Sequence, residues 1–367
     1  MQSSPTSPHD HQVTAFLDAA GSSGQAAARN VRTRLSSLRH QGHLFPITVN
    51  EAEHGNSYVV SPYTAYGPYA LEELDSLMSR APMAPLKGLT LMVAKVLKWA
   101  QIDRIVMVNN WLLSTNLYPE WDGSGAEELT HELANTYPRH LIAFRSLNHY
   151  TNAQLIDQLV VLGYKMVPAR QVYIYDNDDL SWTQRSNTKR DRAVLRQTQF
   201  QHITNEEFHD IDFDAVEGLY NQLYLEKYSY LNPQFTAAFL SACHKQGVME
   251  FEGLKDAGGR LVAIVGTFEY ADVLTAPIVG YDIRMPQELG LYRMGMAMIF
   301  ERALRRKLPL NLSAGAASFK RLRGAQPYIE YTAVYDSHLS WPRRLVISSL
   351  SGLLNTIGVP VMERFEL

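Results

Sequence analysis

Hydrophobic and polar residues recur along the chain with two different periods, which predict alternating helices and strands. Apolar residues at helical spacing within 25–39 precede a strand-like run at 44–49. A long apolar helix is predicted over 86–99, and the β-branched run 104–110 follows it as a strand. The tyrosine-rich stretch 61–70 has no usable period and is expected to be a loop. Helices that alternate with strands indicate helices packed on a sheet, so the expected fold class is α/β (α+β).

The end of the first half is predicted from a strand at 141–147 and a helix that stops at Gly163. Glycine can adopt the left-handed C-cap conformation that returns the chain toward a sheet. An acidic, turn-rich stretch at 176–179 then marks a boundary. Beyond it the charge changes sign in the basic run 185–197, which holds five Lys and Arg residues.

The second half follows the same plan, with helical patterns at 213–227 and 234–245, three strand-like runs, and a helix at 291–306. A length of 367 residues also favours two domains. We therefore expect two tandem domains, each with a mostly antiparallel mixed sheet flanked by helices. The predicted division is a disordered tail at 1–22, domains at 23–178 and 179–340, and a C-terminal helical segment at 341–367.

The apolar stretch 345–361 leaves two interpretations open. Ser, Thr, Asn and Pro residues interrupt it, and it falls short of the roughly 20 clean residues of a membrane-spanning helix. It is either a helix packed on a domain or a peripheral membrane contact through 341–361. The second interpretation rests on Trp341, Arg343 and Arg344, which stand at its entrance where an interfacial anchor would lie.

Composition limits the functions that the chain can have. Hydrophobic residues make up 46% and charged residues 19%, as in proteins that bury sizeable cores. The net charge of -3 argues against DNA as a partner, whereas local basic patches leave RNA open. The single cysteine, Cys243, cannot form an intrachain disulfide and is interpreted as a buried structural thiol. Because the N-terminus has no apolar signal segment, a cytoplasmic location is expected.

Several common sites are not indicated by the sequence. The histidines show no ligand spacing with Cys or carboxylates, so no metal site is expected. A phosphate-binding loop, a dinucleotide-binding fingerprint and a nucleophile elbow are also missing from the sequence.

The segment 311–338 carries the strongest indication of chemistry. Its strand ends in small residues from Ser313 to Ala317, and Phe319 and Lys320 follow. Small side chains let a ligand approach exposed backbone N–H groups. The alternative is a tight strand-to-helix connection in which the small residues only permit close packing.

Four features of this segment stand in a fixed order: Gly315, Phe319-Lys320, Arg323-Gly324 and a closing strand at 328–335. This pattern resembles the FemAB/CelD-like branch of the GNAT acyltransferase superfamily. The resemblance covers 185–338 firmly and the first half more loosely, and it implies two tandem GNAT-like domains with the catalytic one second. It also implies that Lys320 and Arg323 hold a phosphate, carboxylate or carbonyl group of the substrate. The alternative is that both are solvated surface charges.

A second segment, Gln287-Glu-Leu-Gly290-Leu-Tyr292, is similar to the turn on which GNAT enzymes bind the pyrophosphate of coenzyme A. Gln287 and Gly290 match that pattern, whereas Tyr292 replaces a small residue. The resemblance implies acyl-coenzyme A as the donor, while aminoacyl-tRNA and acyl carrier protein remain open. The basic run either meets donor phosphates or is a solvated helix face. The residues assigned to donor binding are Gln287, Gly290, Arg293, Gly315 and Arg323.

Acyl transfer to an amine needs a group that accepts the amine proton and a group that stabilises the tetrahedral oxyanion. Asp282, at the end of an apolar strand, is expected to be the base or to orient the acceptor, because desolvation raises a carboxyl pKa. The alternative is a simple turn residue. Tyr292 is expected to donate a proton, as is Tyr281, and Lys320 is placed at the reacting centre by resemblance.

The amine acceptor is expected to lie between the two halves, along tyrosine-rich segments of both. Packing or contact with water is the alternative for each of these side chains. The residues assigned to acceptor binding are Tyr63, Tyr66, Tyr228, Asn232, Tyr281 and Glu330, with His54, Ser61 and Thr64 as further candidates. Glu330 and His338, on the closing strand, are alternates to the two catalytic tyrosines.

These assignments predict an N-acyltransferase that transfers an acyl or aminoacyl group from an activated donor to an amine. The acceptor would be a small molecule or an envelope precursor. The rival hypothesis is a non-catalytic GNAT-like protein that binds a ligand or a partner.

Overall fold

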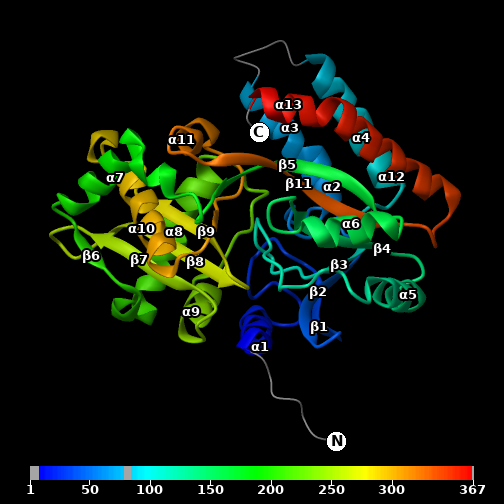
Figure 1. Cartoon of the computed structure of the whole chain (residues 1–367), viewed down its shortest axis with the longest axis horizontal. Helices are drawn as coiled ribbons and strands as arrows, with labels where there is room; N and C mark the ends of the chain where they lie inside the picture. The colour runs from blue at the N-terminus through cyan, green and yellow to red at the C-terminus, as the bar shows by residue number, and fades with distance from the viewer. Residues whose placement is uncertain (1–7, 78–83, 366–367) are drawn as a thin grey trace, which may run out of the picture. The chain divides into compact units, whose positions relative to one another are not determined.

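The computed structural model describes residues 8–77 and 84–365, and the chain forms two compact units. The first unit combines Met1–Arg170, Leu231–Pro233 and Ile329–Phe365. The second unit combines Gln171–Tyr230 and Gln234–Tyr328. Each unit contains a mixed, mostly antiparallel sheet flanked by helices, which confirms the predicted fold class (Figure 1).

The first unit has the strand order β1-β2-β3-β4-β11. Its strands are β1 (Arg34–His40), β2 (His43–Glu51), β3 (Arg104–Val108), β4 (Leu141–Leu147) and the end of β11 (Gln326–Tyr335). Its helices are α1 (Pro8–Ala20), α2 (Pro62–Thr64), α3 (Ala70–Leu77), α4 (Ala84–Trp99), α5 (Ala126–Thr136), α6 (Ala153–Val161), α12 (Trp341–Leu353) and α13 (Val359–Phe365). Strands β3 and β4 pair in parallel, and the other pairs among these five strands are antiparallel.

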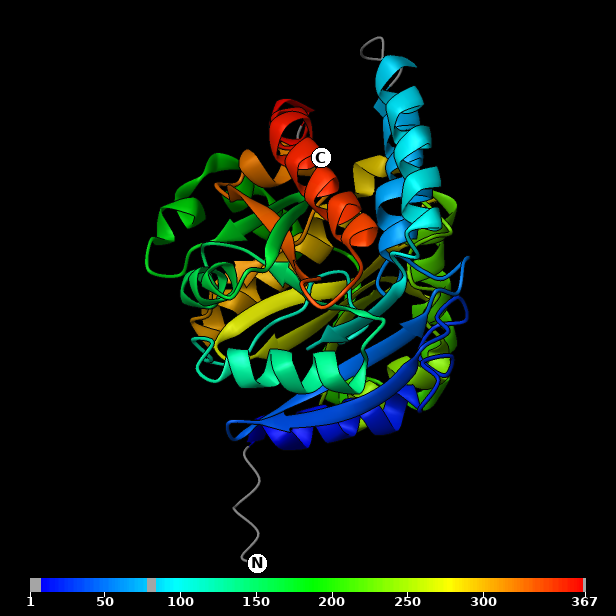
Figure 2. The same cartoon turned by 90° about the vertical axis from the view of Figure 1, so that its right-hand side faces the viewer.

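Alternating side chains of β3 and β4 supply two cores, one on each face of the first sheet. Val106 and Phe144 face the core formed with α5 and α6. Met107 and Ala143 face the core that contains Leu97 of α4 and residues of α12. Because both faces are covered, β4 is buried along its whole length and β3 is buried from Ile105 onward. Figure 2 shows α12 and α13 (red) beside α4 (cyan).

The second unit has the strand order β5-β10-β9-β8-β7-β6. Its strands are the end of β5 (Lys165–Tyr175), β6 (Gln201–Ile203), β7 (Glu250–Lys255), β8 (Leu261–Tyr270), β9 (Val273–Tyr281) and β10 (Leu310–Asn311). Its helices are α7 (Ser186–Arg196), α8 (Phe213–Asn221), α9 (Ala237–Lys245), α10 (Leu291–Arg306) and α11 (Ala317–Arg321). Strands β9 and β10 pair in parallel, and the remaining pairs are antiparallel.

The two halves of the sequence exchange their last strands. β5 follows α6 along the chain, yet its end pairs with β10 of the second unit through Tyr175 and Leu310. β11 follows α11, yet its end pairs with β4 of the first unit through Val334 and Ala143. The predicted domain boundaries, 23–178 and 179–340, assign all of β5 to the first domain and all of β11 to the second. The structure differs, because the end of β5 pairs in the second unit and the end of β11 pairs in the first. The segment expected at 341–367 as a separate part also belongs to the first unit as far as Phe365.

Three local predictions in the first half are wrong. The tail expected at 1–22 contains α1, because Phe16 packs against Trp111 at a ring-centroid distance of 5.1 Å; residues 1–7 lie outside the described part. The helix expected at 25–39 gives way to β1, because Gln41 and Gly42 adopt positive φ angles and form a tight hairpin with β2. The loop expected at 61–70 is largely helical, from α2 through a π-helical turn to α3.

Other elements follow their predictions closely. The strand at 141–147 and the helix at 291–306 have the predicted bounds. Gly163 ends the segment after α6 with a φ of 89°, as its predicted left-handed conformation requires. The long apolar helix expected at 86–99 is α4.

Candidate active site

Strands β9 and β10 separate soon after they pair, which leaves an open strand end in the second unit. They pair only at Leu274 with Leu310 and at Thr275 with Asn311. The chain then joins β5, because the backbone N–H of Leu312 donates to the Tyr173 carbonyl at 2.9 Å. Within the described residues, the end of β9 therefore pairs with β8 alone.

The start of α10 follows directly from this open end of β9. Gly290 adopts a φ of 71° and caps the helix. The first intrahelical bond runs from the Met294 N–H to the Gly290 carbonyl, so the three N–H groups before it lie at the positive end of a 16-residue helix. Gln287 is exposed in the short 3-10 turn just before. This geometry suits an anion, as the sequence resemblance implies.

Asp191 on α7 anchors two of the arginines that were assigned to donor binding. Its carboxylate is fully buried and accepts from Arg293 Nε at 2.6 Å and from Arg323 Nε at 2.5 Å. Arg323 also donates to the Phe319 carbonyl and stacks on the Phe319 ring. Both guanidinium groups therefore bind protein groups. They link α7 to the start of α10 through Arg293 and to the segment after α11 through Arg323. The signal for Asp191 was available, because it is the single acid inside the basic run.

Lys320 is a structural residue and does not project to a ligand. Its side chain is 4% exposed, and its ammonium donates to the carbonyls of Leu312, Ser313 and Ala314 at 2.7, 3.2 and 2.9 Å. These bonds hold the turn in which Gly315 has a φ of 78°. The substrate contact assigned to Lys320 is wrong, because an ammonium has three N–H donors and three carbonyls accept from it.

Aromatic side chains gather around the end of β9. Tyr292 of α10 contacts Tyr281 and Phe319, with ring centroids 5.9 and 4.9 Å apart. Burial raises the pKa of Tyr292, so its hydroxyl stays protonated. The ammonium of Lys227 donates to the Tyr281 hydroxyl at 3.2 Å and lies over the ring of Tyr228. Three of the predicted residues, Tyr228, Tyr281 and Tyr292, are thus brought together here. Gln287 lies in the turn before the helix that carries Tyr292.

Asp282 does not have the properties of a general base. Hydrogen bonds from Arg284, and from Arg260 at 2.7 Å, lower its pKa to about 2 against the opposing effect of burial. The carboxylate is therefore a very weak proton acceptor at neutral pH. The prediction that Asp282 acts as the base is therefore wrong. The sequence did not reveal this, because Arg260 lies in the β7–β8 hairpin and Arg284 in the turn after β9, and neither position forms a recognisable pattern with Asp282.

The remaining acceptor candidates lie in the first unit, and three of them, Tyr63, Asn232 and Glu330, have structural partners there. The backbone N–H of Tyr63 donates to Asp103 at 2.8 Å, and burial raises the pKa of Tyr66 to about 12. The Asn232 carbonyl accepts from Asn30 at 2.8 Å. Glu330 is 2% exposed and accepts from Arg170 Nε at 2.9 Å. Each of these contacts ties a loop or strand to the first unit, and none of them brings a reacting group forward.

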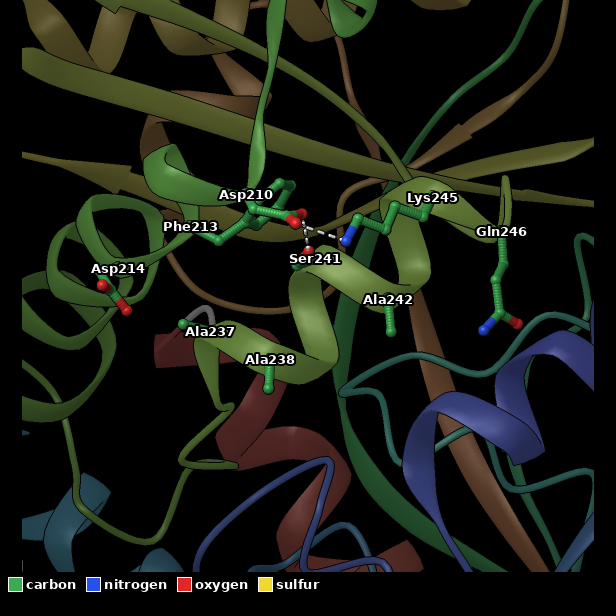
Figure 3. A pocket seen from close by; sticks show the side chains of 9 residues that line it. All are labelled: Asp210, Phe213, Asp214, Ala237, Ala238, Ser241, Ala242, Lys245 and Gln246. Carbon is green, nitrogen blue, oxygen red and sulfur yellow. Dashed lines mark hydrogen bonds and ion pairs between the residues drawn. The ribbon is translucent and has the colours of Figure 1, made fainter.

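A separate shallow groove of ≈ 460 Å³ lies in the second unit beside α8 and α9 (Figure 3). Ser241 and Lys245 on α9 both bond to the Asp210 carboxylate, at 2.8 and 2.6 Å. Asp210 and Lys245 are exposed, so this is an ordinary surface ion pair. The groove includes none of the residues assigned from the sequence.

Cys243 and the acidic side chains give no second chemistry in the described ranges 8–77 and 84–365. The thiol is fully buried, and burial raises its pKa, which leaves it unreactive. No group of three or more His, Cys, Asp or Glu side chains in these ranges is arranged to hold a metal ion.

The family model that matches this chain is described as "Acetyltransferase (GNAT) domain" and covers 183–321. Residues 183–321 match the model of a GNAT domain. The GNAT domain therefore includes the basic helix α7, the open end of β9, the α10 start and the loop held by Lys320. The predicted superfamily is confirmed for this part of the chain.

Several solved structures resemble the fold at low sequence identity. L-PGS from Bacillus licheniformis is 14% identical over 62% of this chain and 79% of that chain, with a TM-score of 0.45. FemX is 9% identical over 57% and 75%, with a TM-score of 0.46. A tandem GNAT protein from the clavulanic acid biosynthesis pathway is 12% identical over 89% and 96%, with a TM-score of 0.39. These likenesses assign no activity, and no curated protein matches the chain.

Proposed function

We propose that this protein is an N-acyltransferase that moves an acyl or aminoacyl group from an activated donor to an amine. The observation that carries the proposal is the open end of β9 directly before the start of α10, within a GNAT domain. The motif around Phe319 and Lys320 favours the FemAB-like branch, although Lys320 serves it by shaping the loop.

The donor would bind through its anionic groups at the α10 start. The N–H groups of 291–293 and the exposed amide of Gln287 are the nearest protein donors. Positive charge stands close by, because Arg190 lies one helical turn before Val194, whose side chain is 3.6 Å from a Cβ built on Gly290. Lys189 and Arg190 are both exposed. We favour the phosphates of acyl-coenzyme A; aminoacyl-tRNA and acyl carrier protein carry the same chemistry.

The transfer step would use the hydroxyls of Tyr281 and Tyr292. The neutral acceptor amine attacks the donor carbonyl, and the tetrahedral oxyanion collapses with loss of the thiolate or alcohol leaving group, while water takes the amine proton. Because the Tyr281 oxygen already accepts from Lys227, its own proton is available for the oxyanion. The phenol of Tyr292, which stays protonated, would donate a hydrogen bond to the departing thiolate or alkoxide, and the water that took the amine proton would then protonate that leaving group.

The acceptor amine would approach beside Tyr228, which is 57% exposed next to Lys227. A small molecule or an envelope precursor is the expected acceptor class. We place the reaction in the cytoplasm, where activated acyl donors of these kinds are made, and DNA has no part in it.

The first test measures the thermal unfolding midpoint with coenzyme A, acetyl-coenzyme A, long-chain acyl-coenzyme A and aminoacyl-tRNA. A donor that binds the folded state raises the midpoint. Acyl release is then followed with an amine mixture for the wild type and for Tyr281→Phe. Loss of one oxyanion donor is expected to lower kcat roughly 100-fold with little change in KM. Tyr230→Phe, which alters an exposed tyrosine of the same segment, is the control.

The alternative is a GNAT-like protein that binds a ligand without catalysis. It is favoured by Tyr292, which stands where the coenzyme A pattern has a small residue, and by the absence of a strong base at Asp282. A donor that raises the midpoint but is never turned over with any amine would support this alternative.

A further inference from the structure

The outer face of α4 in the first unit is unusually apolar. Its exposed positions from 91 to 99 are Leu91, Met92, Lys95, Val96, Lys98 and Trp99, with Met92 58% and Trp99 68% exposed. The opposite face, with Ala94 and Leu97, is buried in the core. A surface helix in water normally presents polar side chains on its outer face. A contiguous apolar face of this kind indicates an interaction surface.

The C-terminal helices extend this apolar surface. Trp341–Phe365 forms one helical segment that is long and apolar enough to cross a membrane, and only 11% of its most apolar window is buried. The interpretation as a packed helix therefore accounts for few of its residues, chiefly Ile347 and Leu350. Trp341 and Leu345 are 72% and 57% exposed.

Arg343 joins the start of α12 to the end of α4. Its guanidinium donates to the carbonyls of Ala100 and Gln101 at 2.9 and 3.2 Å. The two exposed tryptophans consequently lie at the same end of the helix pair, because Trp99 ends α4 and Trp341 begins α12. Tryptophan is the residue that prefers the boundary between headgroups and hydrocarbon, because its ring is apolar and its N–H is polar.

The charges on α4 and α12 have one sign. α4 contains Lys87, Lys95 and Lys98 and no acidic residue, and Lys87 is paired with Asp75 of α3. Between 341 and 362 the charged residues are Arg343 and Arg344. An apolar strip flanked by cations complements the surface of an anionic bilayer.

We propose that α4 and α12 form a peripheral membrane surface that binds bilayers rich in anionic lipid. This α4–α12 surface consists of Leu91, Met92, Val96, Trp99, Trp341 and Leu345 and its flanking lysines Lys95 and Lys98. A second copy of the chain fits less well, because a symmetric dimer would bring like patches together and oppose the lysines of both copies. The inference goes beyond the transferase proposal and stands without it.

Co-sedimentation of the full chain with vesicles tests the proposal. Vesicles of phosphatidylcholine with phosphatidylglycerol are expected to bind the protein, and pure phosphatidylcholine vesicles far less. Lys95→Gln with Lys98→Gln should weaken binding roughly fivefold for each charge removed. Leu91→Gln with Val96→Gln should weaken it by a similar or larger factor. Lys307→Gln with Arg196→Gln removes two exposed charges from the second unit and should have no effect.

Tryptophan fluorescence gives an independent readout of the same surface. The chain has five tryptophans, and Trp111, Trp121 and Trp182 are buried. A blue shift with anionic vesicles, and quenching by brominated lipid, should therefore come from Trp99 and Trp341 and be lost when both are changed to Phe. Sedimentation with neither vesicle type would overturn the proposal. So would binding that the α4 variants leave unchanged, or a dimer in sedimentation velocity that Leu91→Gln dissociates while vesicles fail to bind.

Discussion

The two units contain the same strand, helix and parallel strand arrangement, but they present its helix start differently. β3-α5-β4 in the first unit and β9-α10-β10 in the second each place a left-handed glycine, with a φ of 71°, at the helix start. In the first unit a Cβ on Gly125 would lie 2.7 Å from the side chains of His40 and Gln41. In the second unit the nearest atom to a Cβ on Gly290 belongs to Val194, at 3.6 Å.

The two helix starts also differ in their charge and in the pairing of the strands beside them. The first turn of α5 contains Glu127 and Glu128, whereas the first turn of α10 contains no acid. β3 and β4 pair over four residues, and β9 and β10 over two. A crowded helix start with two acids in its first turn disfavours an anion, whereas an open start favours it when its own first turn has no acid and only Glu288 precedes it. One arrangement therefore serves as scaffold in the first unit and as a candidate donor site in the second.

The largest effect is expected for Asp191→Ala, which removes the anchor beneath the α10 start. The change leaves Arg293 and Arg323 without their buried counter-charge and should lower the free energy of unfolding by about 3–5 kcal/mol. Urea denaturation measures it. Asp178→Ala, at an exposed position, should stay within about 0.5 kcal/mol of the wild type. Equal effects of the two variants would show that the buried anchor does not support the second unit.

Lys320→Met should have the next largest effect. The substitution keeps a long apolar stem but leaves three carbonyls of the Gly315 turn without their donor, at a cost of about 3 kcal/mol. Denaturant unfolding monitors stability, and donor binding should fall as well because the turn loses its shape. Lys307→Met, an exposed lysine on the same unit, is the matched control. A stable Lys320→Met protein with unchanged donor binding would show that these three hydrogen bonds do not hold the turn in its shape.

Gln287→Glu should make the second helix start resemble the first. A second carboxylate before α10, beside Glu288, repels the anionic donor, and we expect roughly fivefold weaker donor binding at low salt and a smaller effect at high salt. Titration calorimetry with the donor identified by thermal unfolding gives the affinity. The same change at Gln41, beside the first-unit glycine, should leave the affinity unchanged. If Gln41→Glu weakens binding more than Gln287→Glu does, the assignment of the two units is reversed.

The smallest effects concern two carboxyls whose pKa values move in opposite directions from the usual 3.8. Burial raises the pKa of Asp103 in the first unit to about 6, so its stabilising contribution is present below pH 4 and is lost as pH rises through 6. Arginine hydrogen bonds lower the pKa of Asp282 to about 2, so its contribution is present above pH 4 and is lost as pH falls through 2. Unfolding free energies of Asp103→Asn and Asp282→Asn against pH should show these opposite trends. If the stability of the two variants, relative to the wild type, changed with pH in the same direction, the opposite pKa shifts of Asp103 and Asp282 would be refuted.

Much of the fold followed from local pattern. The apolar strand at 141–147 and the helix at 291–306 are long and periodic, and the structure reproduces their bounds. The exchange of β5 and β11 could not be predicted, because strand pairing depends on contacts between distant segments that leave no local signal. α1 was missed since its buried Phe16 follows a stretch rich in Ser and Pro.

The candidate site was predicted less well than the fold. The turn from Gln287 to Gly290 was predicted correctly, because it needs a left-handed backbone conformation at its last residue and glycine is the residue that adopts it most readily. The charged residues were misread because sequence shows charge but not burial: Lys320 points into the protein, and Asp282 meets Arg260 and Arg284. A charged residue inside a short loop of small residues is thus as good a candidate for holding the loop as for holding a ligand.

Hydrogen–deuterium exchange with and without acetyl-coenzyme A, and with and without aminoacyl-tRNA, tests the central claim that the second unit alone binds the activated donor. Protection is expected in peptides that cover 287–294 and 312–320 with one of these donors, and no change in peptides that cover 109–130 of the first unit. Protection confined to 109–130, or no change in any peptide with either donor, would contradict the account.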